Sequence, residues 1–156
     1  MIILSAAQGR QQRLKELEDF EKRLTAIVLQ ERLDDLSDVL DFEVIVGLER
    51  QVRAAVIDDD LQKKGEHYCR IYNTACARRW YGPKFLSVKD ILTKERQSLR
   101  TDIRFFKAEE EDLDFAYITY SWGRSPLEYG WKDGVMVELE RIGGGWKIRA
   151  LFPVDY

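Results

Sequence analysis

The sequence predicts an α+β protein in which three to four N-terminal helices pack on a C-terminal four-stranded antiparallel meander. Apolar residues recur at steps of three and four over the first half of the chain, as in amphipathic helices. The last third is rich in alternating β-branched and aromatic residues, which favour strands. The 156 residues fit one domain. Within it we expect a helical N-terminal extension over residues 1–60 and an α+β core over residues 61–156.

Two helical stretches account for the first 60 residues. The apolar positions of the first stretch run from Leu14 to Val28, and those of the second run from Leu33 to Val56. Asp34, Ser37 and Asp41 are candidate N-caps between them, so we expect a break there. Both stretches precede the first proline of the chain, which suits an all-helical N-terminal half.

Two further helices are expected before the strands begin. The apolar residues of Leu61–Tyr81 form one helical stripe, and Gly82 with Pro83 should end that helix. A shorter helix is expected over Ser87–Leu99. It opens with a serine followed three residues later by Asp90, which resembles a capping box.

Four strands complete the chain, at residues 103–107, 113–122, 135–142 and 146–152. Each alternates apolar and polar residues except the second, which is largely apolar on both faces. Three consecutive glycines, Gly143–Gly145, separate the last two strands and predict a tight hairpin.

The cysteines, the single histidine and the N-terminal residues bear on cofactors and compartment. If Cys69 and Cys76 lie on one helix, they stand about 10 Å apart, beyond the roughly 7 Å that a disulfide can span. We therefore expect two reduced thiols. With one histidine as the remaining ligand, we expect no metal and no cofactor. The first seven residues lack the basic segment of a signal peptide, and no apolar run has the length of a membrane span. These features favour a cytoplasmic protein.

The last hairpin carries a family resemblance. The run Val135-Met-Val-Glu-Leu-Glu-Arg-Ile-Gly-Gly-Gly-Trp-Lys-Ile148 resembles the closing hairpin of the nuclear-transport-factor-2-like superfamily, whose members share a cystatin-like α+β cone. The resemblance implies a cone-like core over residues 61–156. It leaves function open, because that group includes lyases and isomerases as well as adaptors, immunity proteins and oligomerisation modules.

Charge is distributed unevenly along the chain. The formal net charge of −3 is the result of an acidic segment 1–61, a basic segment 62–107 with a net charge of +8, and an acidic segment 108–156. The basic segment either contacts an acidic partner or is neutralised by the acidic helices of its own fold. Its candidate contact residues are Arg70, Arg78, Arg79, Lys84, Lys94, Arg96 and Arg100.

Three functions fit these features. The first, which we favour, is a non-catalytic protein-interaction module of the adaptor, inhibitor or immunity type that binds an acidic protein, with no catalytic residue. The second is a small-molecule lyase or isomerase with a pocket between helix and sheet, lined by Tyr68, Tyr72, Trp80 and Tyr117. The third is a small nucleic-acid-binding accessory protein, which the acidic ends make less favourable. A homodimer through the first helix or the outer sheet face is also possible.

Overall fold

The computed structural model describes residues 5–47, 51–93, 99–121 and 134–154. In the described residues every helix lies before the last four strands, and two further strands lie between the second and third helices. The elements are α1 (Ala6–Leu29), α2 (Leu33–Asp38), β1 (Leu40–Val46), β2 (Gln51–Arg53), α3 (Ala54–Lys63), α4 (Glu66–Tyr72), α5 (Thr74–Tyr81), α6 (Val88–Thr93), β3 (Arg100–Lys107), β4 (Glu111–Ser121), β5 (Gly134–Ile142) and β6 (Gly145–Val154). The α+β class predicted from the sequence is confirmed.

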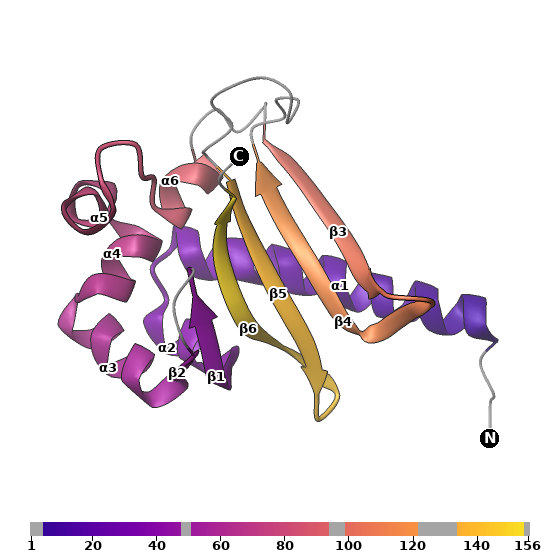
Figure 1. Cartoon of the computed structure of the whole chain (residues 1–156). Coiled ribbons are helices and arrows are strands. Elements are labelled where there is room, and N and C mark those ends of the chain that lie inside the picture. The colour runs from indigo at the N-terminus through magenta and orange to yellow at the C-terminus, as the bar shows by residue number, and fades with distance from the viewer. Residues whose placement is uncertain (1–4, 48–50, 94–98, 122–133, 155–156) are drawn as a thin grey trace.

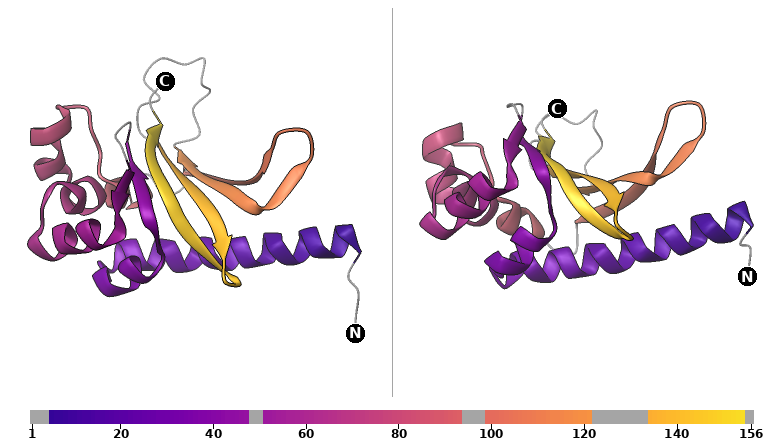
Figure 2. Two further views of the ribbon diagram at one scale, coloured as in Figure 1. Left: turned by 60° about the horizontal axis from the view of Figure 1, so that its bottom comes forward. Right: turned by 90° about the horizontal axis from the view of Figure 1, so that it is seen from below.

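The strands form one mixed sheet in the order β2-β1-β6-β5-β4-β3. Strand β1 pairs in parallel with β6, whereas the other neighbouring pairs are antiparallel. The long helix α1 lies across one face of the sheet, and α3, α4 and α5 form a lobe beside β1 (Figures 1 and 2). At the opposite edge the hairpin of β3 and β4 curls away from the other strands (Figure 2).

The last four strands form as predicted, and the first helix has a clear local cause. Ser5 caps α1 by accepting a hydrogen bond from the backbone N–H of Gln8, and the Gln8 side chain accepts one from the Ser5 N–H in return. Between β5 and β6, Gly143 and Gly144 adopt φ values of 60° and 81°. This left-handed conformation is the one that a two-residue hairpin turn requires and that glycine adopts without strain.

The prediction of one four-stranded antiparallel meander is wrong, because the second helical stretch ends at Asp38. The residues after it form β1, in which Val44 and Val46 are buried. The spacing of Leu40 and Val44 fits a helix face as well as a bulged strand. The β-branched run Val44-Ile45-Val46 favours the strand, and pairing with the edge of β6 gives its backbone hydrogen-bond partners.

The helix predicted over Leu61–Tyr81 is in fact three helices. Lys64 adopts the left-handed conformation that ends α3. Asn73 adopts an extended conformation and accepts a hydrogen bond from the backbone N–H of Cys76, so it caps α5. The break brings the Cα atoms of Cys69 and Cys76 to 5.3 Å, and the two residues form a disulfide. The expectation of two reduced thiols is therefore corrected.

A single hydrophobic core joins the two halves of the chain. Leu17 and Ile27 of α1, Leu61 of α3 and Ile118 and Ile148 of the sheet are all fully buried in it. The N-terminal helices and β1 thus cover the same core as the last four strands. Of the helices in the described residues, none combines the length and apolar content needed to cross a membrane.

Candidate functional site

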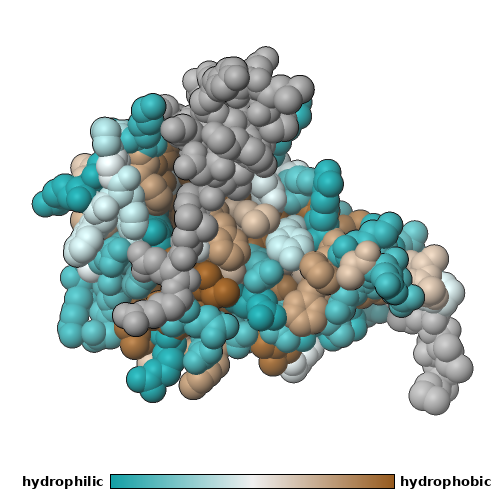
Figure 3. Space-filling model, in the orientation of Figure 1, coloured by the Kyte–Doolittle hydropathy of each residue, from teal (hydrophilic) through white to brown (hydrophobic). Residues whose placement is uncertain are grey.

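Helix α5 and the turn after it carry cations around an exposed tryptophan. We define the α5 surface as Arg78, Arg79, Trp80 and Lys84. Trp80 is 61% exposed, and the three cations are exposed as well. None of the three has a carboxylate oxygen within 4.0 Å in the described ranges of the chain. Hydrophilic residues cover most of the lobe that holds α5 (Figure 3).

The position of Trp80 differs from the sequence prediction, which placed it on the apolar stripe of Tyr72. Because the helix breaks at Asn73, that stripe does not continue into α5, and Ala77 is the residue that α5 buries. Arg78 in turn donates a hydrogen bond from Nε to the carbonyl oxygen of Phe85 at 3.1 Å. This bond ties the end of α5 to the turn that follows and leaves the guanidinium at the surface.

The structure divides the basic segment predicted from the sequence. Lys89 forms an ion pair with Glu31 at 2.8 Å, which is the internal neutralisation considered above. Arg100 lies exposed on β3, at the edge of the sheet away from β1 and β2. Lys94 and Arg96 lie outside the described residues. The cations at α5 therefore form a group separate from Arg100.

Arg70 does not belong to the surface at all. It is only 6% exposed, because it lies on α4, whose residues from His67 to Tyr72 are all buried. The Cζ atom of its guanidinium lies 4.0 Å from the ring centre of Tyr81 and 6.0 Å from that of Phe85. Within the described residues, Nε and Nη1 have no hydrogen-bond partner.

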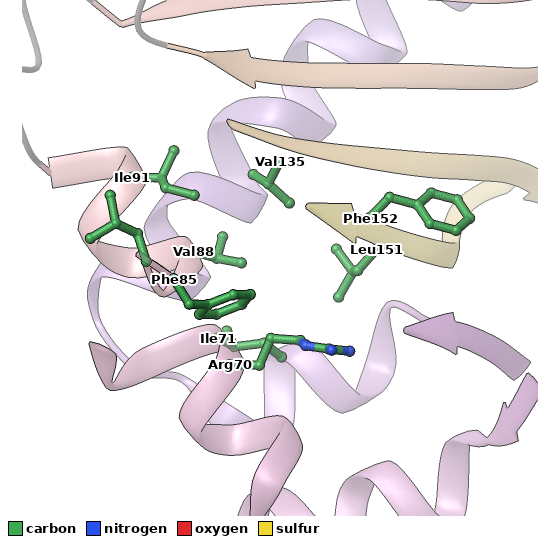
Figure 4. Close-up of a pocket in the computed structure, with 9 residues that line it drawn as sticks. Arg70, Ile71, Phe85, Val88, Ile91, Val135, Leu151 and Phe152 are labelled. Atoms are coloured by element: carbon green, nitrogen blue, oxygen red, sulfur yellow. The ribbon is translucent and has the colours of Figure 1, made fainter. Parts of the chain in front are cut away.

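A small cavity lies beside Arg70 between the helices and the ends of β5 and β6 (Figure 4). The space in it that a water-sized sphere can occupy is about 20 Å³. Its walls are apolar apart from Arg70. They consist of Ile71, Phe85, Leu86, Val88, Ile91, Val135, Leu151 and Phe152.

The four aromatic residues predicted to line a pocket are not brought together. Tyr68 and Tyr72 stack in α4 with ring centres 5.1 Å apart, but Trp80 is at the surface. Tyr117 alternates with the buried Ala116 and Ile118 and so faces the other side of the sheet, where its ring lies 6.3 Å from that of Phe106.

The buried tyrosines are poor candidates for proton transfer at neutral pH. Tyr68 donates a hydrogen bond to Glu31 at 3.2 Å; burial and the nearby Glu31 carboxylate raise the pKa of Tyr68. Burial also raises the pKa of Tyr72, with Glu31 a lesser cause. Both phenols therefore stay protonated. In the described part of the chain, no three His, Cys, Asp or Glu residues lie close enough together to hold a metal ion.

Sequence reasoning missed the groups that surround Arg70. Gly47 follows β1, and a Cβ atom added to it would lie 2.9 Å from Nη1 and Nη2 of Arg70. Tyr81 and Phe85 come from α5 and the next turn, and their rings lie 4.8 Å apart. The one sequence signal was a glycine directly after a β-branched run, which marks a close approach of the backbone to another group.

Comparisons with known proteins give fold likenesses only. No protein-family model matches the chain, and no curated protein matches its sequence significantly. One similar structure is a designed nuclear-transport-factor-2-like protein, with 11% identity over 87% of this chain and 94% of that one, at a TM-score of 0.44. Another is a candidate calcium/calmodulin-dependent kinase II association domain from Exiguobacterium sibiricum, with 14% identity over 100% of this chain and 99% of that one, at a TM-score of 0.41. The designed protein carries the name of the superfamily that the closing hairpin resembles.

Proposed function

We propose that this chain is a non-catalytic protein-interaction module that binds an acidic segment of a partner protein through the α5 surface. The observation that carries the proposal is Trp80, a large aromatic side chain left exposed among cations that have no carboxylate neighbour in the described residues. Tryptophan and arginine are the residues that most often dominate the binding energy of protein interfaces. A basic patch also steers and orients an acidic partner.

The contrast with the other arginines supports this proposal. Where α1 meets the sheet, Arg10 pairs with Glu111 at 2.8 Å and Arg141 pairs with Glu16 at 3.0 Å. Those cations hold the fold's own elements together. Arg79 has no such neighbour in the described ranges, so its charge is available to a second molecule.

Position at a helix end is the competing explanation for Arg78 and Arg79. They occupy the last turn of α5, where a cation is stabilised by about 0.3–1 kcal/mol through the partial negative charge of the carbonyl groups. That interaction needs charge but no aromatic neighbour. Trp80 is therefore the residue that separates a binding role from a purely structural one.

The test compares partner capture by matched variants. Two variants alter the α5 surface, Arg78→Glu with Arg79→Glu, and Trp80→Ala. Their controls are Lys22→Glu with Arg23→Glu on the exposed side of α1, and Phe42→Ala, another exposed aromatic residue. Each protein is cross-linked to its neighbours in nuclease-treated extract, and the bound proteins are identified.

The proposal expects one set of proteins with acidic segments to be captured by the wild type and both controls and lost by both α5 variants. Circular dichroism should show all five proteins folded. Equal capture by the α5 variants would overturn the proposal. Capture that is present in a parallel untreated extract and absent from the nuclease-treated extract would also overturn it, in favour of nucleic-acid binding.

The lyase or isomerase alternative has less support. Arg70 is the one ionisable residue among those described that line the cavity, and a guanidinium does not give up its proton in proteins. Proton transfer needs a group that titrates near the working pH. The chemistry of the cavity therefore favours binding.

A cytoplasmic location is kept as part of the proposal. The Cys69–Cys76 disulfide weighs against it, because such bonds persist mainly in oxidising compartments. Quenching intact cells in acid and alkylating the free thiols under denaturing conditions decides the point, because Cys69 is only 2% exposed in the folded protein. A cytoplasmic protein should be labelled on both cysteines, and an unlabelled pair would contradict that location.

A further inference from the structure

Arg70 is a buried cation with an unused hydrogen-bonding capacity. It is more than nine-tenths buried, and two of its three guanidinium nitrogens find no acceptor in the described residues. No carboxylate oxygen of those residues lies within 4.0 Å of it. A buried charge is normally paired, because the loss of water is otherwise uncompensated.

The groups that touch Arg70 hold it in place without pairing it. The centre of the Tyr81 ring lies 4.0 Å from Cζ. At this distance the face of the aromatic ring attracts the cation. A ring face offers nothing to N–H groups that point outward in the plane of the guanidinium. Gly47 lies against Nη1 and Nη2, since any Cβ there would come within 2.9 Å of both. The side chain is thus positioned by its surroundings, and Nε and Nη1 have no acceptor among the described residues.

The cavity beside Arg70 indicates which kind of acceptor those N–H groups could bind. Eight apolar residues form the rest of its lining, including Ile71, Phe85 and Leu151 (Figure 4). A site of apolar walls and one fixed charged group is typical of pockets for small organic ions. An inorganic anion would satisfy the charge but would gain nothing from these walls.

We infer that this cavity binds a small monocarboxylate, whose carboxylate pairs with Arg70 and whose carbon chain lies against the apolar walls. The planar fork of a guanidinium matches the two oxygens of a carboxylate. The free space of about 20 Å³ limits the buried part to the carboxylate and a short chain. Phe85, Leu86 and Phe152 are only partly buried, so they can cover the rest of the molecule at the mouth. This site uses none of the α5 surface and is independent of the function proposed above.

The first test uses a matched pair of ligands on the unaltered protein. Sodium butyrate and butyramide have similar shapes and differ in charge. Isothermal titration in a carboxylate-free buffer should show butyrate binding about 10- to 100-fold more tightly than butyramide, the ratio expected for charge-assisted hydrogen bonds. Sodium chloride at equal ionic strength should not compete.

The second test uses a matched pair of variants. Arg70→Met removes the charge and keeps an unbranched apolar side chain, and Arg23→Met removes an exposed arginine of α1 that has no ion pair in the described residues. Butyrate should bind Arg23→Met as it binds the wild type and should bind Arg70→Met about 10- to 100-fold more weakly.

Three results would overturn the inference: no butyrate binding, equal binding of butyrate and butyramide, or displacement of butyrate by chloride. All three are measured on the unaltered protein, so they hold even if Arg70→Met fails to fold. Unchanged butyrate affinity in a folded Arg70→Met protein would equally remove Arg70 from the site.

Discussion

Replacing Arg70 by methionine should stabilise the protein. The native side chain places a positive charge in the interior, with Nε and Nη1 unpaired among the described residues. Methionine removes the charge, fills an irregular apolar space well and has a helix propensity close to that of arginine. The perturbation therefore removes one electrostatic cost and creates little cavity.

The size of the effect follows from two opposing contributions. Desolvating an ion costs several kcal/mol in real proteins. The contact between Cζ and the Tyr81 ring at 4.0 Å returns about 2 kcal/mol for a desolvated cation. The difference predicts that Arg70→Met raises the free energy of unfolding by about 1–3 kcal/mol, or the melting temperature by roughly 2–4 °C for each kcal/mol.

The assay is urea unfolding of the wild type, Arg70→Met and Arg23→Met in a buffer free of carboxylates. Arg23 is exposed on α1, so its change should stay within about 0.5 kcal/mol. A loss of more than about 1 kcal/mol in Arg70→Met would refute the reasoning, because it would mean that Arg70 has an anionic partner in the folded protein.

Four further changes have defined outcomes. Gly47→Ala should lower the free energy of unfolding by about 1–2 kcal/mol, because the φ of 73° at this position disfavours a side chain. Gly9→Ala, in open space on α1, should instead raise the free energy of unfolding by about 0.5–1 kcal/mol. Chemical denaturation measures both changes. The Cys69–Cys76 disulfide closes a short loop, and its reduction should lower the free energy of unfolding by about 2–3 kcal/mol. A reductant should therefore lower the melting temperature of the wild type and leave that of a Cys69→Ser, Cys76→Ser protein unchanged. Asn73→Ala should cost about 1 kcal/mol by removing the cap of α5, and Asn73→Asp should restore it. The hydrogen bond from Lys89 lowers the pKa of the Glu31 carboxyl group. The stability that this bond adds is therefore present above the unfolded-state pKa and is lost as the pH falls through the lower folded-state pKa. Glu31→Gln should lower the free energy of unfolding by about 0.5 kcal/mol at pH 7, and its melting temperature should fall less than that of the wild type in a series of decreasing pH.

Local sequence signals predicted the elements that depend on local physics. The three glycines at Gly143–Gly145 gave the hairpin, and Ser87 with Asp90 gave the start of α6, where the Asp90 N–H donates to the Ser87 hydroxyl at 3.2 Å. The alternation of residues 135–142 and 146–152 was equally informative, because one face of each of these two strands is buried in the core.

The sequence could not predict features that depend on distant partners. The strand β1 forms because β6, about 100 residues later in the chain, offers a parallel edge. The site was harder still. From the sequence, Arg70 was expected to be one of several surface cations. Its burial results from the break at Asn73, which places α5 and Tyr81 back beside α4. A second misreading, the disulfide, has the same cause, since only that break brings Cys69 and Cys76 together.

The division of the central cations into an outward set on α5 and an inward Arg70 is tested most directly by nuclear magnetic resonance of the arginine Nε–H groups. Butyrate should shift the Nε–H resonance of Arg70 and leave that of Arg79 in place, while a glutamate-rich peptide should shift Arg79 and leave Arg70 in place. Equal shifts of both resonances with either ligand, or no response of Arg70 to butyrate, would contradict the division.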